Sequence, residues 1–179
     1  MLAKLACESF VAAMEVDCDP YWLTLTGVTG CGKTYLLRQV FREAKRINPG
    51  NPANTPIWPP DWETNGARSH DASRPGCFLY DEGGFASRMR NGAYDLPRAH
   101  YDDFFVGFDE VGVTRDPTNF ISEAVGTLCD VRLRRWTMFC TNLSLQEISE
   151  RMDARIASRM IRSGNKVIEI NAGDYALRA

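Results

Sequence analysis

The residues best suited to chemistry in this chain lie in one stretch with the pattern G-x-x-x-x-G-K-T. The stretch consists of Gly27, Val28, Thr29, Gly30, Cys31, Gly32, Lys33 and Thr34. Glycines at these positions let the backbone turn its amides inward, toward the oxygens of a phosphate group. The Lys33 ammonium group is placed to reach the β- and γ-phosphates of a nucleoside triphosphate, and the Thr34 hydroxyl to bind Mg²⁺. The stretch therefore predicts a site for ATP and Mg²⁺, and Tyr35, the next residue, is included among the expected ATP-binding residues.

The segments on either side of this loop agree with that interpretation. Residues 21–26 are rich in β-forming side chains and lead straight into the loop, while residues 35–41 carry apolar side chains at helical spacing. A strand, a loop and a helix in this order aim the N-terminus of the helix at phosphate. A chance glycine-rich turn does not explain both flanks.

An acidic pair, Asp109 and Glu110, follows the apolar residues 104–108. Hydrolysis of a triphosphate needs a Mg²⁺ ion held in place and a water made nucleophilic. We expect Asp109 to bind the metal, usually through its water, and Glu110 to polarise the attacking water. Because a simple kinase does not need the second carboxylate, Glu110 favours ATP hydrolysis.

Three further polar residues are candidates for the reaction. Asn142 ends the next apolar segment and fits a sensor of the γ-phosphate, although asparagine at a strand end is also a good turn residue. Arg155 and Arg159 are four residues apart and share a helix face. One of them, supplied across an oligomer interface, would stabilise the transferring phosphoryl charge. The alternative is two surface arginines paired with nearby acidic side chains (Glu147, Glu150 or Asp153).

The elements that position these residues alternate between strand and helix along the chain. We expect strands at 21–26, 76–80, 104–108, 136–141 and 166–171, and helices at 2–14, 33–46, 84–91, 117–134, 144–152 and around Arg155 and Arg159. Residues 91–104 are expected to form a loop through Pro97. Pro117 is placed in the first turn of its helix, which is expected to bury Leu133. Ser144 and Glu147 predict a capping box. This alternation favours an α/β fold with a parallel sheet of about five strands flanked by helices.

Length and composition suit one soluble domain covering residues 1–179, in which residues 1–20 form an N-terminal helix and turn. Six of the nine prolines fall within residues 49–75, which predicts a long surface loop inside the domain. The six cysteines are scattered without a C-x-x-C pair, so we expect free thiols and a cytoplasmic location. No apolar run is long enough to span a bilayer, and the net charge of −2 does not indicate a general nucleic-acid binder.

Residues 22–175 resemble the AAA+ ATPases of the DnaC/IstB type, which include bacterial and phage replicative-helicase loaders and transposition helper ATPases. The resemblance is carried by residues 108–112 (Phe-Asp-Glu-Val-Gly), 141–144 (Thr-Asn-Leu-Ser) and 155–160 (Arg-Ile-Ala-Ser-Arg-Met). It implies a P-loop NTPase fold of the AAA+/ASCE type without a separate lid domain. It also implies that Asn142 is the first sensor and Arg159 the arginine finger, with Arg155 as an alternative.

The same resemblance implies partners. The family forms homo-oligomeric open rings or spirals, binds single-stranded DNA and, in the loader branch, engages a hexameric replicative helicase. A helix near residues 83–91 would bind DNA, which makes Arg88 and Arg90 candidate phosphate contacts. Two departures stand out: only about twenty residues precede the first strand, and Tyr175 is followed by Ala176 where the family often has arginine.

The leading hypothesis is an ATP-hydrolysing DNA-replication accessory of the helicase-loader type, in a reduced, phage-like layout. The alternatives are a small viral or transposon DNA motor or transposition helper, a P-loop kinase, and a regulator that binds ATP without hydrolysing it. The presence of Lys33, Thr34, Asp109, Glu110 and Asn142 together argues against the regulator.

Overall fold

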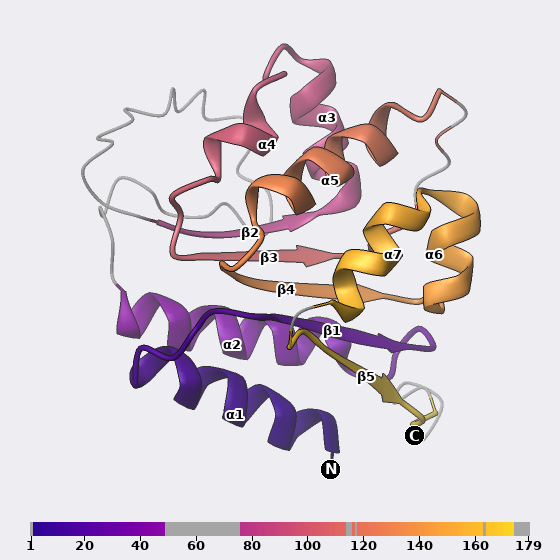
Figure 1. Cartoon of the computed structure of the whole chain (residues 1–179). Coiled ribbons are helices and arrows are strands. Elements are labelled where there is room, and N and C mark those ends of the chain that lie inside the picture. The colour runs from indigo at the N-terminus through magenta and orange to yellow at the C-terminus, as the bar shows by residue number, and fades with distance from the viewer. Residues whose placement is uncertain (1, 49–75, 114–115, 117, 163, 174–179) are drawn as a thin grey trace.

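Five parallel strands form the central sheet of this chain in a computed structural model that describes residues 2–48, 76–113, 116, 118–162 and 164–173 (Figure 1). The strands are β1 (Trp22–Gly27), β2 (Cys77–Asp81), β3 (Phe105–Asp109), β4 (Trp136–Thr141) and β5 (Lys166–Ile170). Their order across the sheet is β2-β3-β4-β1-β5, and every neighbouring pair is parallel. All carboxyl ends therefore lie along one edge of the sheet.

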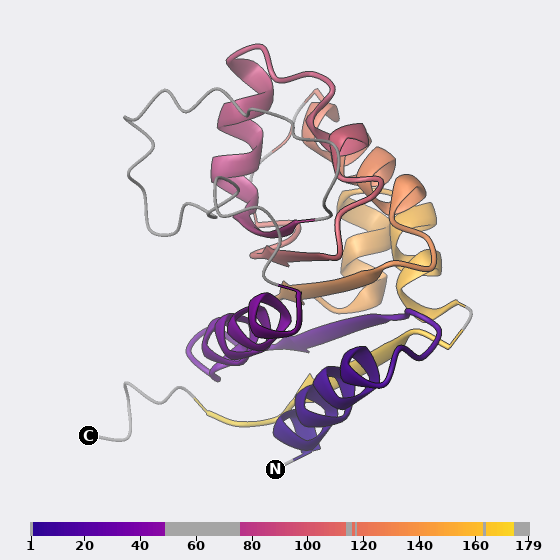
Figure 2. The same cartoon turned by 90° about the vertical axis from the view of Figure 1, so that its left-hand side faces the viewer.

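Helices cover both faces of the sheet, as Figures 1 and 2 show. On one face lie α1 (Leu2–Glu15) and α2 (Lys33–Ile47). On the other lie α3 (Glu82–Arg90), α4 (Leu96–Ala99), α5 (Phe120–Val131), α6 (Leu145–Arg151) and α7 (Ala154–Ile161). Each face has its own apolar cluster, one centred on residues such as Phe10, Leu37 and Phe105, the other on residues such as Phe85, Phe108 and Phe139.

The strand sequences explain this layering. All six residues of β4 and all five of β3 are buried, as expected for strands of a parallel sheet that is covered on both faces. Strand β5, at the edge, is only partly buried. Among the described residues, no helix is both long enough and apolar enough to cross a bilayer.

The expected elements agree with the structure, with two corrections. A short helix, α4, stands where a loop through Pro97 was expected, since proline is compatible with the first turn of a helix. Helix α5 begins at Phe120 and not near Pro117, which lies outside the described residues, and it ends at Val131. Leu133 follows the helix end and is 48% exposed, so its expected burial is wrong. Residues 49–75 and Tyr175 also lie outside the described residues.

All six cysteines are free thiols, in agreement with the sequence-based expectation. The capping box of α6 is also confirmed. The Ser144 side chain accepts a hydrogen bond from the Glu147 backbone, and the Glu147 carboxylate accepts one from the Ser144 backbone.

Candidate active site

The loop of residues 27–32 joins the carboxyl end of β1 to the first turn of α2. Gly27, Gly30 and Gly32 all have positive φ angles (144°, 76° and 97°), a region that glycine enters without steric cost. A Cβ atom on Gly27 would lie 2.7 Å from the carbonyl oxygen of Ile170 on β5. The glycines of the motif are therefore required by backbone conformation and by the close approach of a neighbouring strand.

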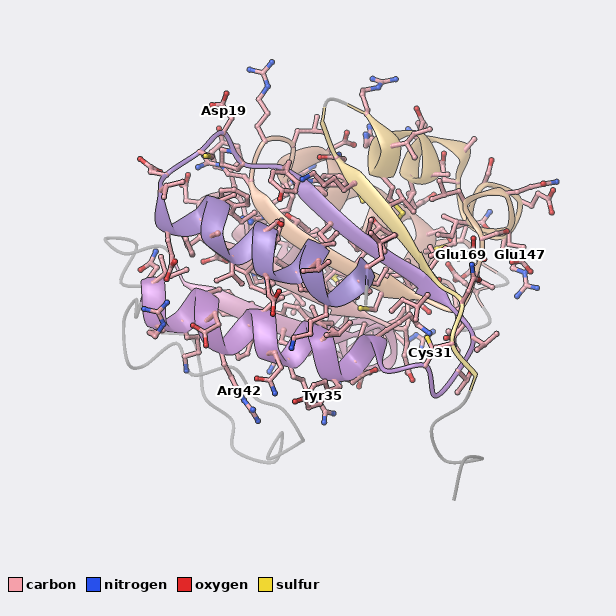
Figure 3. All side chains as sticks on the ribbon, turned by 90° about the horizontal axis from the view of Figure 1, so that it is seen from below. Asp19, Cys31, Tyr35, Arg42, Glu147 and Glu169 are labelled. Carbon is pink, nitrogen blue, oxygen red and sulfur yellow. The ribbon has the colours of Figure 1, made fainter. Side chains whose placement is uncertain are left out.

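The N-terminus of α2 is open toward this loop. No side chain caps it at Gly32, so its first N–H groups keep their capacity for an anion. Cys31 is buried beside the loop, whereas Val28, Thr29 and Gly30 are exposed. Tyr35 is 65% exposed and projects from the side of α2 that faces away from α1 (Figure 3).

The Lys33 side chain is 7% exposed and folds along the inside of the loop. Its ammonium group donates hydrogen bonds of 2.7 Å to the carbonyl oxygens of Gly27 and Val28 and lies 3.4 Å from the Cys31 sulfur. This cation is the only charge within the motif itself, and it is held where phosphate oxygens are expected. Thr34 is half-buried one position further along.

Asp109 and Glu110 lie at the carboxyl end of β3, separated from β1 by β4. Asp109 is 5% exposed, and one of its carboxylate oxygens accepts a hydrogen bond of 3.0 Å from the Glu110 backbone. Glu110 is exposed and has a φ angle of 59°, which is uncommon for a residue other than glycine and typical of functional sites. Partial burial and then the neighbouring Asp109, Asp81 and Glu82 carboxylates raise the pKa of Glu110.

The loops after β3 and β4 are tied together. The Val111 backbone N–H donates to the carbonyl oxygen of Cys140 (3.0 Å), and the Thr141 hydroxyl donates to the carbonyl oxygen of Val111 (2.7 Å). Asn142 follows directly and is exposed at the same edge of the sheet. The structure thus brings Lys33, Asp109, Glu110 and Asn142 to the carboxyl ends of three adjacent strands.

Arg155 and Arg159 are not equivalent, although both lie on α7. Arg155 is exposed and pairs with Asp153 at 2.7 Å, the surface pairing that the sequence left open. The Arg159 side chain is only 17% exposed and pairs with Asp130, in the last turn of α5. Ion pairing therefore holds Arg159 against a second helix and leaves Arg155 on the surface.

The candidate DNA contacts lie on α3. Arg90 is exposed in the last turn, and the guanidinium carbon of Arg88 lies 5.8 Å from the ring centroid of Tyr80. In the described residues, no contact joins either arginine to the phosphate loop. If Arg88 and Arg90 bind a ligand, that ligand is therefore not the nucleotide held by this loop.

Asp81 and Glu82, at the end of β2, were missed by the sequence reasoning. Asp81 lies opposite Asp109 in the β2–β3 register, and Glu82 is 1% exposed. A signal was available, because the segment Tyr80-Asp81-Glu82 repeats the aromatic-Asp-Glu order of residues 108–110. These two carboxylates belong to the surroundings of Glu110.

The donor set fits ATP with Mg²⁺. In the described part of the chain, no three His, Cys, Asp or Glu side chains are grouped to hold a metal. Mg²⁺ commonly uses one or two carboxylates together with substrate phosphates and water. Asp109 and the Thr34 hydroxyl suit that role, and Lys33 with the glycine backbone suits the triphosphate.

Comparisons with known proteins give information on the fold of the chain. No protein-family profile matches the sequence. A search of curated proteins likewise finds no match.

Solved structures do share the fold. The replication initiator DnaA bound to AMPPCP and single-stranded DNA aligns over 94% of this chain and 46% of its own, with a TM-score of 0.66 and 17% identity. The DnaC helicase loader aligns over 93% and 87%, with a TM-score of 0.64 and 17% identity. DnaI aligns over 95% and 82%, with a TM-score of 0.63 and 18% identity. The chain spans just under half the length of that DnaA structure.

These alignments extend over almost all of the chain. The chain therefore shares the overall fold of these DnaA, DnaC and DnaI structures.

Proposed function

We propose that this protein is an ATPase of the helicase-loader type, which hydrolyses ATP as an oligomer acting on single-stranded DNA, on a replicative helicase, or on both. The observation that carries the proposal is the gathering of Lys33, Asp109 and Glu110 at one edge of the sheet. Lys33 binds phosphate, Asp109 holds Mg²⁺, and Glu110 accepts a proton from the attacking water.

The position of Arg159 argues against a role at the phosphate loop of its own subunit. Asn165 accepts a hydrogen bond from the Trp22 backbone and donates one to the carbonyl oxygen of Arg159, both at 2.7 Å. The end of α7 therefore lies at the amino end of β1, whereas the phosphate loop lies at its carboxyl end. A strand of this length spans roughly 17 Å, which exceeds the reach of an arginine side chain. Arg159 is accordingly assigned to the nucleotide of a neighbouring subunit.

The DNA part of the proposal rests on α3 and on fold-level likeness. Arg88 and Arg90 lie in the last turn of that helix, and arginines contact the backbone of single strands through charge. DnaA shares the fold and has been solved with AMPPCP and single-stranded DNA. The same likeness to DnaC supports a helicase as the protein partner.

The test is ATP hydrolysis by the purified protein, with and without single-stranded DNA, over a range of protein concentrations. We expect the rate per subunit to rise with concentration and with DNA, because the site is completed between subunits. A rate that is independent of both contradicts the proposal and favours a kinase or a partner-dependent switch.

A mixing experiment tests the role of Arg159. Arg159→Ala subunits keep their own phosphate loop, and Lys33→Ala subunits keep their Arg159. Mixing the two inactive variants is expected to restore part of the activity, since some interfaces then combine an intact Lys33 with an intact Arg159. Arg162→Ala, an exposed arginine just after α7, is the matched control and should stay active alone. Absence of restoration contradicts an arginine acting between subunits.

A further inference from the structure

A hydrogen bond joins α3 to the loop that carries Glu110. The Glu82 carboxylate accepts a hydrogen bond of 2.8 Å from the backbone N–H of Gly112. Glu82 is the first residue of α3, and Gly112 lies two residues beyond Glu110. Glu82 is 1% exposed, so water competes little for this hydrogen bond.

The loop needs support, because its backbone is strained. Glu110 has a φ angle of 59° and Gly112 one of 80°. Sparsely populated conformations such as that of Glu110 persist only where the surroundings hold them. On the β4 side, Val111 supplies that support through its bonds to Cys140 and Thr141. On the α3 side, the support comes from Glu82.

The packing around Gly112 is uneven. A Cβ atom at Gly112 would lie 2.5 Å from the Leu143 side chain and 3.3 Å from the Met152 sulfur, so this side is tightly filled. Next to the Glu82–Gly112 bond lies a cavity of about 280 Å³, bordered also by Asp116, Ile121 and Arg151. The Glu82–Gly112 bond is therefore bordered by this cavity as well as by packed side chains.

Asp81 strengthens the connection between α3 and the site. Its side chain caps α3 by accepting a hydrogen bond of 2.7 Å from Gly84, and its backbone lies opposite Asp109 in the sheet. The start of α3 thus contacts the end of β3 through the sheet and the following loop through Glu82. The far end of the same helix carries Arg88 and Arg90.

We propose that Glu82 is a positioning residue that transmits the binding of an anionic polymer at α3 to the hydrolytic carboxylate Glu110. A single-stranded nucleic acid held at Arg88 and Arg90 shifts α3, the Glu82–Gly112 bond moves the loop, and Glu110 takes the position required for attack by water. The inference rests on the proposed function and deepens it by naming the link between ligand and hydrolysis.

The test compares Glu82→Ala with Glu82→Gln. Glutamine keeps an oxygen that accepts the Gly112 N–H, whereas alanine does not. For the wild type and each variant, kcat and KM for ATP are measured with and without a single-stranded oligothymidine. We expect Glu82→Ala to lose the stimulation by DNA while KM for ATP stays unchanged, and Glu82→Gln to retain most of the stimulation. Glu8→Ala, an exposed carboxylate on α1, is the control and should behave as wild type.

The outcomes separate the two proposals. A wild type that DNA stimulates, with Glu82→Ala stimulated to the same degree, overturns the link and leaves the ATPase intact. Equal loss of DNA stimulation in Glu82→Gln and Glu82→Ala also overturns the link, because glutamine can still accept the hydrogen bond from Gly112. A wild type that hydrolyses no ATP under any condition overturns both.

If Glu82→Ala fails to fold, amide hydrogen exchange of the wild-type protein tests the same link without a substitution. The amide of Gly112 is expected to change its exchange rate when the oligothymidine binds, since its acceptor moves with α3. An unchanged rate, under conditions where binding is measured independently, overturns the link.

Discussion

The Lys33 ammonium group lies 2.7 Å from the carbonyl oxygen of Gly27, the first residue of its own loop. It lies at the same distance from the carbonyl oxygen of Val28. One cation therefore holds the loop closed from inside and supplies the charge for phosphate. Removing it affects both the shape of the loop and its attraction for ATP.

Lys33→Ala should weaken ATP binding by about ten- to a hundred-fold, the effect of losing hydrogen bonds to a charged group. Titration calorimetry with ATP and Mg²⁺ measures this directly. Lys4→Ala, an exposed lysine on α1 at 3.8 Å from Glu8, serves as the control and should bind as wild type. An unchanged affinity in Lys33→Ala would remove the phosphate-binding role from this loop.

Glu110→Gln should lower kcat by roughly 10²- to 10⁴-fold, the usual contribution of a general base. ATP binding should persist, because Lys33 and Asp109 are unchanged. Steady-state hydrolysis and nucleotide titration on the same preparation separate the two effects. Glu150→Gln, an exposed carboxylate on α6, is the control. Equal hydrolysis rates in Glu110→Gln and wild type would refute the role given to Glu110.

Gly27→Ala and Gly126→Ala should have opposite effects on the free energy of unfolding. Alanine at position 27 meets the carbonyl oxygen of Ile170 at a φ angle of 144°, so a loss of about 1–3 kcal/mol is expected. Gly126 lies inside α5 with nothing near its Cβ position, so alanine there should add about 0.5–1 kcal/mol. Urea denaturation of both variants is the measurement. A stable Gly27→Ala variant would show that the loop tolerates a side chain.

Arg132→Met should destabilise the fold by at least about 3 kcal/mol, because it leaves several buried carbonyl oxygens without a donor. Its guanidinium group is fully buried and donates to the carbonyl oxygens of His100 (2.8 Å), Asp103 (2.5 Å) and Trp136 (2.6 Å). Burial lowers the pKa of Arg132 to about 9, so the group remains a cation at neutral pH. Arg98→Ala, on the exposed side of α4, should change the unfolding free energy little. A loss below about 1 kcal/mol in Arg132→Met would contradict this account.

The thiols should differ sharply in reactivity. Burial raises the pKa of Cys7, Cys77 and Cys129 to about 12, and burial also raises the pKa of Cys140 well above its usual value. Near neutral pH they stay protonated, and protonated thiols react slowly. Cys18 is exposed, so iodoacetamide should modify it first. The rates of the buried thiols should climb as the pH approaches their pKa values. Mass spectrometry of time points is the measurement, and Cys18→Ser should remove the fast phase.

Local patterns in the sequence predict most of the helices and strands and the phosphate-binding motif. The glycine-rich loop is a local pattern. Gly27, Gly30 and Gly32 adopt positive φ angles, which glycine reaches without steric cost, so the residue types alone indicate the loop conformation. Strands β3 and β4 are runs of buried, mostly apolar residues, and the capping box of α6 depends only on Ser144 and Glu147. Alternation of strands and helices was enough to predict a parallel sheet with its polar ends on one edge.

Contacts between residues that are far apart in the sequence follow from the folded structure. The pairing of β2 with β3 places Asp81 opposite Asp109, and the insertion of β4 between β1 and β3 allows Val111 to bond to Cys140. The partner of Arg159, the burial of Arg132 and the bond from Glu82 to Gly112 all connect separate elements. No local pattern encodes such contacts, because strand order and helix packing are set by how the whole apolar surface is buried, not by the spacing of residues within one segment.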